Sequence, residues 1–446
     1  MIAKITASTV YSTLGNNSSL VPLAIKDVAN SCGLTAASYM SGDAVEGKDR
    51  FIDEFGTQAI WLGGLPVFNK IFEKLLYTPA KLDSKVDARI LKNSEILKAA
   101  QEFAPTEAIK SSLEQVASHQ KTFKMLTVAK FAAASLATTL SYLGLTKFRH
   151  KYTENQIKKD YFEKQKHKHI SFKDKSYQNV PFSAAFAQVH DDKKNNKNVT
   201  FTGGVENFIF DPVRNLMLVD GAITGERLSH ARNPQDFFGY VIKEGSFWAF
   251  MYFAGPLISK ALELNAEKKH NKSIDLDARI IESEQFKNAF KNGTIKSHLE
   301  AFKAADKSDV DIYKFAVKSA NTPNQEAKNL VIEMAKKSDI IEMAKGSEKV
   351  DTRKYIDLNN LRGVAQKMEK LLNQYESSGE SLDGFFASVR KLKRTAVIKN
   401  IGACIGALGV AVPAIMLLVR HFSPEYQVKK DIEKQLEESL VKNNSK

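Results

Sequence analysis

An uncharged stretch of fifteen residues occurs twice in this chain and constrains its fold more than any other feature. The two stretches are Phe55–Asn69 and Gly245–Ser259. Each follows a glutamate, ends before a lysine and has proline at its twelfth position; these residues are Glu54, Lys70 and Pro66, and Glu244, Lys260 and Pro256. A glutamate before and a lysine after suit the partial charges at the two ends of a helix. The pattern therefore predicts two helices built alike.

The two stretches belong to a longer internal repeat. Residues 51–91 align without gaps on residues 241–281 at a constant offset of 190, with ten identities in 41 positions. The longest identical run is Asp87-Ala-Arg89-Ile in the first copy and Asp277-Ala-Arg279-Ile in the second. A repeat of this length indicates that one structural unit has been duplicated.

A second block confirms the duplication at sequence level and locates an insertion. Residues 149–160 align on 420–431 at an offset of 271, with seven identities in twelve. The offset has grown by 81 residues, so the second copy is predicted to carry an insertion of about that size within 282–394. Insertions of this kind are usually surface elaborations.

Two further uncharged stretches are candidates for membrane insertion. Phe131–Thr146 is sixteen residues long and rich in alanine, serine and threonine, so a helix inside a soluble bundle would look the same. Ile401–Val419 runs nineteen residues between Lys399 and Arg420, the length and flanks of a transmembrane helix. Within it Gly402, Gly406 and Gly409 are predicted to let another helix approach closely, unless they merely reflect composition.

Pro413 lies in the same stretch. In water it would break a helix, whereas in a bundle the neighbouring helices can satisfy the freed carbonyl.

Net charge points to a lipid surface. The formal charge is +14, and two stretches, 149–200 and 389–446, supply twelve of these excess charges next to the longer apolar runs. Such flanks are attracted to anionic lipid and tend to face the cytoplasm. Nucleic acid is not expected as a partner, because few aromatic residues are interleaved with the lysines and no recognition motif accompanies them.

No motif in the sequence predicts catalysis, a cofactor or a metal site. A phosphate-binding loop, HExxH, CxxC and GxSxG are all absent from the sequence. His167, His169 and His190 lie in a basic segment expected to be disordered, so a metal site there is disfavoured. The two cysteines are far apart, which excludes a disulfide framework, and no cleavable signal is expected.

The repeated Asp-x-Arg motif is the most specific polar match between the copies. Residues two apart on a helix face different ways, so Asp and Arg of one motif are not expected to pair with each other. One hypothesis is that the arginine reaches the equivalent carboxylate of the other copy. The alternative is a helix-capping aspartate beside a solvated arginine in each copy.

These patterns together predict an all-α protein of two tandem copies of a helical unit with membrane-inserted apolar helices. The predicted parts are a flexible arm at 1–24, repeat 1 at 25–165, a basic polar linker at 166–200, and repeat 2 with its insertion at 201–446.

The leading functional hypothesis is a non-enzymatic membrane anchor or scaffold that binds anionic lipid, with a protein partner at 282–394. The alternatives are a transporter or channel built on the two repeats, which the lack of charge within the apolar runs disfavours, and a soluble helical interaction protein. Homo-oligomerisation stays open.

Overall fold

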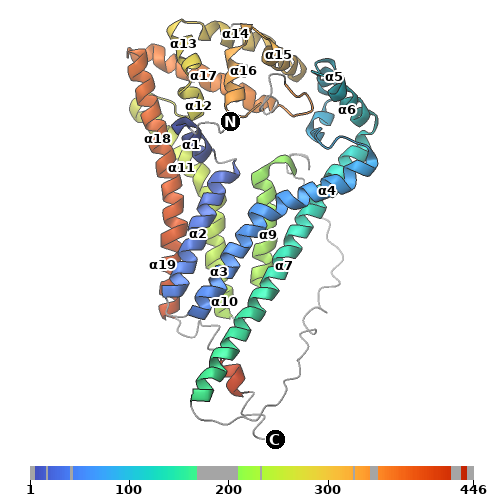
Figure 1. Cartoon of the computed structure of the whole chain (residues 1–446). Helices are drawn as coiled ribbons and strands as arrows, with labels where there is room; N and C mark the ends of the chain where they lie inside the picture. Colours follow the sequence, from blue (N-terminus) through green and yellow to red (C-terminus); the bar gives the residue numbers. More distant parts are fainter. Residues whose placement is uncertain are drawn as a thin grey trace, which may run out of the picture.

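The computed structural model describes residues 6–16, 19–40, 44–167, 209–231, 234–324, 327–341, 350–422 and 433–438. These residues are helical throughout, apart from loops and one isolated antiparallel bridge between Ile341 and Ile356. The prediction of an all-α fold is thus confirmed for the described part of the chain. The helices form a long bundle with a helical head across one end of it (Figure 1).

The bundle consists of helices that run along its length, three of them with a π-helical turn in the middle. Its elements are α2 (Leu20–Met40), α3 (Ala44–Ala59), η1 (Ile60–Gly64), α4 (Leu65–Ala80), α7 (Gln120–His167), α9 (Pro212–Ser229), α10 (Pro234–Trp248), η3 (Ala249–Phe253), α11 (Ala254–His270), α18 (Leu382–Gly406), η6 (Ala407–Ala411) and α19 (Val412–Phe422).

The head consists of shorter helices from both halves of the chain. Its elements are η2 (Ala88–Lys92), α5 (Ser94–Glu102), α6 (Glu107–Ser118), α12 (Ala278–Ile281), α13 (Glu284–Lys291), α14 (Ile295–Ala305), α15 (Asp309–Asn321), α16 (Leu330–Lys337) and α17 (Leu358–Ser378). Polar side chains fix where many of these helices begin. Asn93, Thr106, Ser308 and Asp357 each accept a hydrogen bond from a backbone N–H of the first turn.

One continuous hydrophobic core holds the head together. Leu113 of the first half and Phe286 of the second are both fully buried in it, beside Val331 and Leu361 from the predicted insertion. Four aromatic rings, those of Phe286, Phe290, Phe385 and Phe386, pack edge to face at centroid distances of 5.0–5.9 Å. The expectation that the insertion is only a surface elaboration is therefore wrong, because its buried side chains complete this core.

The bundle has the opposite distribution of polarity. Every strongly exposed large hydrophobic side chain among the described residues lies in a bundle helix or in α1 (Ala7–Gly15), including Val410 at 69 % and Leu257 at 68 % exposure. Buried charges also gather in the bundle: in the described part of the head only Lys272 is a buried charged residue. Two helices, residues 120–163 and 382–419, are long and apolar enough to cross a membrane.

The segments on either side of predicted repeat 1 differ from the sequence-based prediction. The predicted flexible arm is wrong over α1 (Ala7–Gly15), which packs on α12 and α18, with the Ser12 hydroxyl donating to Asp277 Oδ2 at 2.6 Å. Helix α7 continues through His167, two residues into the predicted linker. The rest of that linker, with His169 and His190, lies outside the described residues, as do 423–432 of the second basic block.

Glu263 and Asp275 form an acidic pair at the junction between bundle and head, beyond the apolar stretch Gly245–Ser259. Burial, together with the neighbouring Asp275 carboxylate, raises the pKa of Glu263 from 4.5 to about 7. The folded protein therefore keeps the Glu263 proton to a higher pH than the unfolded chain does. Glu263 consequently lowers stability as pH rises from about 4.5 to 7, and the penalty is constant above that range.

Glu263→Gln should remove this penalty. We expect the variant to be more stable than the wild type at pH 8 and equal to it near pH 4.5, as measured by thermal unfolding across that range. The matched control is Glu300→Gln in α14, an exposed glutamate, which should not change the pH profile. A Glu263→Gln profile parallel to that of the wild type at every pH would contradict the shifted pKa.

Candidate functional site

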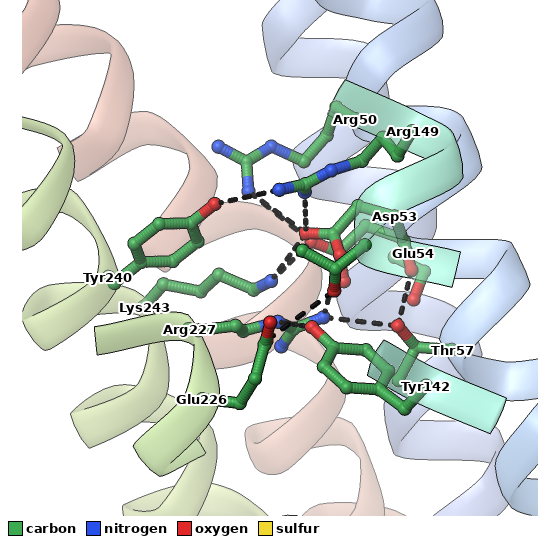
Figure 2. A network of polar contacts seen from close by, with 12 residues as sticks. Arg50, Asp53, Glu54, Thr57, Tyr142, Arg149, Glu226, Arg227, Tyr240 and Lys243 are labelled. Carbon is green, nitrogen blue, oxygen red and sulfur yellow. Dashed lines mark hydrogen bonds and ion pairs between the residues drawn. The ribbon is translucent and has the colours of Figure 1, made fainter. Parts of the chain in front are cut away.

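Six buried charged side chains meet inside the bundle and form what we call the ionic cluster (Figure 2). They come from four helices: Asp53 and Glu54 from α3, Arg149 from α7, Arg227 from α9, and Lys243 and Glu244 from α10. None of the six is more than 7 % exposed. Burial of this many charges is costly unless each is paired, so the pairing decides what the cluster can do.

Asp53 is the centre of the ionic cluster. Its Oδ2 lies 2.8 Å from Arg149 Nη1 and 3.5 Å from Lys243 Nζ, while its Oδ1 lies 3.2 Å from Arg227 Nη2. One carboxylate thus holds cations from three other helices. The other two pairs extend outward from it: Lys243 Nζ lies 2.6 Å from Glu54 Oε1, and Arg227 Nη1 lies 2.5 Å from Glu244 Oε1.

Neutral side chains add hydrogen bonds at the edge of the cluster. Arg227 Nε donates to the Tyr142 hydroxyl at 2.7 Å, and Arg149 Nη2 donates to the Tyr240 hydroxyl at 3.2 Å. Thr224 donates to Glu244 Oε2 at 3.1 Å. The six members are three acids and three bases, and a fourth cation, Arg50 of α3, lies beside them at 3.7 Å from Asp53 Oδ2 and 3.6 Å from Glu54 Oε1. An arrangement of paired opposite charges is suited to joining helices rigidly.

The ionic cluster corrects the sequence-based interpretation of Glu54 and Glu244. Both were expected to mark helix starts at a membrane or water boundary. The helices instead begin at Ala44 and Pro234, ten residues earlier in each copy, so both glutamates lie mid-helix on an inward face. Lys70 and Lys260, at the other end of each stretch, are exposed, but they lie within α4 and α11 and so do not end their helices either.

Sequence reasoning missed four members of the cluster, although two signals were available. Lys243 follows Asp53 by 190 residues, the offset of the repeat, so equivalent positions carry opposite charges and lie 3.5 Å apart in the fold. Arg149 opens the second repeated block. For Arg227 no signal was present in the sequence.

Proline explains the π-helical turns. Each turn ends two or three residues before a proline: η1 before Pro66, η3 before Pro256 and η6 before Pro413. A proline ring clashes with the carbonyl four residues earlier, and widening the helix by one residue relieves that clash while leaving carbonyls without a helical donor. Pro66 and Pro256 therefore each leave their helix with fewer backbone donors than carbonyl acceptors.

The glycines predicted to pack helices do so only in part. Gly409 packs closely against Ala29 of α2, where an added Cβ would lie 3.2 Å from the Ala29 carbonyl oxygen. Gly402 and Gly406 have nothing within 4 Å of an added Cβ and are exposed, so the prediction is wrong for these two within the monomer. The reason is geometric: residues 402 and 406 lie on the outward face of α18.

The repeated Asp-x-Arg motifs lie in the head, and both the hypothesis of pairing between copies and the expectation of a solvated arginine are wrong. Asp87 and Asp277 precede their helices, so each caps the N–H of the arginine two residues on, at 2.9 and 2.8 Å. From that position each carboxylate also binds its own arginine, with Arg89 Nη2 2.7 Å from Asp87 Oδ2 and Arg279 Nε 3.2 Å from Asp277 Oδ1. The capping role itself is confirmed.

A third motif of the same form lies within 282–394, the predicted insertion. Asp351 accepts a hydrogen bond from the Arg353 N–H at 3.0 Å, and its Oδ2 lies 2.8 Å from Arg353 Nη2. Burial opposes ionisation of Asp351, but the hydrogen bonds and charge of Arg353 outweigh it and lower the pKa of this carboxyl. Arg353 also binds Asp83 at 2.8 Å, which fastens the insertion to the first half of the chain.

The described residues contain no group of three or more His, Cys, Asp or Glu placed to hold a metal ion. Cys32 is exposed and Cys404 buried, and both are free thiols.

Comparison of the chain with protein-family models, curated proteins and solved structures finds no match.

Proposed function

We propose that this protein is a non-enzymatic membrane scaffold whose bundle is embedded in lipid and whose helical head is held at the membrane surface to bind a protein partner. The inverted polarity of the bundle carries the proposal. Its outward side chains include many leucine, valine, isoleucine and phenylalanine residues, whereas its interior holds the ionic cluster. Water would favour the reverse arrangement, which the head follows, and lipid favours the one seen in the bundle.

The proposal includes duplication of one helical unit. In each half, the helix that crosses the bundle runs on through a π-helical turn, and the next helix of the head starts after a capping motif at Asp87 or Asp277. The apolar helices α7 and α18–α19 both run away from the head (Figure 1). We propose that the basic segments that follow these helices in the sequence face the cytoplasm.

The ionic cluster supports a scaffold because its charges are matched. Each of its six members has an opposite charge within 3.5 Å, so the cluster can brace α3, α7, α9 and α10 in a medium that offers no water to isolated ions. The insertion, which shares the core of the head, gives the second copy an additional surface. A partner at 282–394 would bind to this part of the head.

Arginine substitution on the outward face tests the placement in lipid. Leu136→Arg in α7 and Val410→Arg in η6 should each reduce the fraction of protein that resists a carbonate wash and is released by detergent. The expected cost is ~2.5–3.5 kcal/mol at the centre of a membrane helix. The control is Glu300→Arg, at an exposed head position.

If the bundle were soluble, Leu136 and Val410 would already face water. Both arginine variants would then fractionate and unfold like the control, and the proposal would be wrong.

A second candidate function is a carrier or channel. The observation that favours it is the presence of ionisable residues inside the bundle, since such residues often line ion pathways. Purified protein in sealed vesicles should then pass protons or alkali cations faster than empty vesicles, and Asp53→Asn should abolish the flux. If vesicles containing correctly folded protein pass these ions no faster than empty vesicles, the carrier or channel hypothesis is wrong and the scaffold is the remaining proposal.

A further inference from the structure

Lys26 of α2 is a buried cation that the ionic cluster does not use. Its side chain is only 2 % exposed, and its Nζ lies 3.4 Å from the carbonyl oxygens of Phe250 and Met251 in η3. Its third neighbour is the thiol of Cys404 on α18. Among the described residues no carboxylate lies within ion-pair distance of this ammonium, whereas Lys243 has three.

The two carbonyls are available because of Pro256. In η3 the Ala254 N–H already donates to the Ala249 carbonyl, five residues earlier. The next donors along the helix are Gly255 and residue 256, which is proline and has no N–H. The carbonyls of Phe250 and Met251 therefore share one helical donor between them, and at least one oxygen needs a partner from outside the helix.

Backbone carbonyl oxygens turned toward one point are the ligands with which proteins replace the hydration shell of an alkali cation. Helices interrupted within a bundle present such oxygens, which bind the coupling cation in several transporters. A lysine ammonium has the same charge and comparable demands for oxygen ligands. We propose that the carbonyls of Phe250 and Met251 form a site for a monovalent cation, which the Lys26 ammonium occupies as a tethered ion.

The site goes beyond the scaffold function and does not depend on it. It joins α2, η3 and α18 at one point, so a cation there holds the first copy of the unit against the second. Because lysine supplies the cation covalently, the wild-type protein needs none from solution. Without the lysine amine, the stability of the fold should depend on sodium or potassium in solution.

The test compares thermal unfolding of the full-length protein in detergent in sodium, potassium and choline chloride at equal ionic strength. The wild-type midpoint should be the same in all three salts. Lys26→Ala should unfold at a lower temperature in choline, and sodium or potassium should raise its midpoint by about 1–2 °C at concentrations tenfold above Kd. The control is Lys272→Ala in the head, a buried lysine paired with Glu380 at 2.6 Å, which should show no such selectivity.

A second variant separates the site from a general loss of packing. Pro256→Ala returns an N–H to the helix, so the double variant Lys26→Ala/Pro256→Ala should be less destabilised than Lys26→Ala and indifferent to the cation. If Lys26→Ala does not fold, the double variant should still fold. Equal midpoints for Lys26→Ala in the three salts, or failure of both variants to fold, would overturn the cation site.

Discussion

Replacing Arg227 with alanine should lower the free energy of unfolding by ~3–5 kcal/mol, the cost of breaking a buried ion pair by removing one partner. Arg227 lies 3.2 Å from Asp53 and 2.5 Å from Glu244, so its loss leaves two carboxylates buried with fewer cations. It also donates to Tyr142 at 2.7 Å. Thermal or denaturant unfolding in detergent measures the effect.

The matched control is Arg362→Ala in the head. Arg362 lies 2.9 Å from Asp306 and 2.8 Å from Asp309, so its contacts resemble those of Arg227, but its side chain is 26 % exposed. Solvent screening limits such a pair to ~0.2–1 kcal/mol. The loss in free energy of unfolding for Arg227→Lys should lie between the losses for Arg227→Ala and Arg362→Ala, because lysine keeps the charge and loses the geometry of the guanidinium. Equal effects of the two alanine variants would show that the cluster does not brace the bundle.

The sequence predicted the helices of the bundle better than the chemistry inside them. Apolar runs and their lysine flanks located Phe55–Asn69, Gly245–Ser259 and Ile401–Val419 because a run without charge is a local signal. A charge at the end of such a run can face either headgroup or interior, however, and only the helix's rotation within the bundle decides which. Glu54 and Glu244 face the interior, which no local pattern encodes.

The head was the least predictable part for a related reason. Its core is shared by helices from both halves of the chain, including the predicted insertion, so Leu113 packs in the same core as Val331. Amphipathic spacing predicts that each helix buries a face, but it does not say against which helix. The pairing of Asp87 with Arg89 was missed because the argument against it assumed helical spacing between the two residues, whereas Asp87 stands before the helix with an extended backbone.

Glycine spacing in the sequence likewise does not predict which helix a glycine contacts. The sequence singled out Gly402, Gly406 and Gly409 by their spacing, and only Gly409 is packed, against α2. Its partner there is Gly33, which no motif marked. Pro413 cannot donate to the Gly409 carbonyl four residues before it, so this oxygen is left to face α2. Gly33 lets the α2 backbone approach that oxygen.

Gly33→Ala should therefore separate α2 from η6. A Cβ at position 33 would lie 2.2 Å from the Gly409 oxygen, a backbone atom that cannot rotate away, so the helices must shift. We expect a loss of ~1–3 kcal/mol, and a larger loss for Gly33→Leu, measured by thermal unfolding in detergent. Gly402→Ala makes the same substitution where nothing lies within 4 Å, and it should instead stabilise by ~0.5–1 kcal/mol because alanine favours a helix. The two variants thus have opposite expected signs, and stabilisation by Gly33→Ala would mean that α2 and η6 do not cross at this glycine pair.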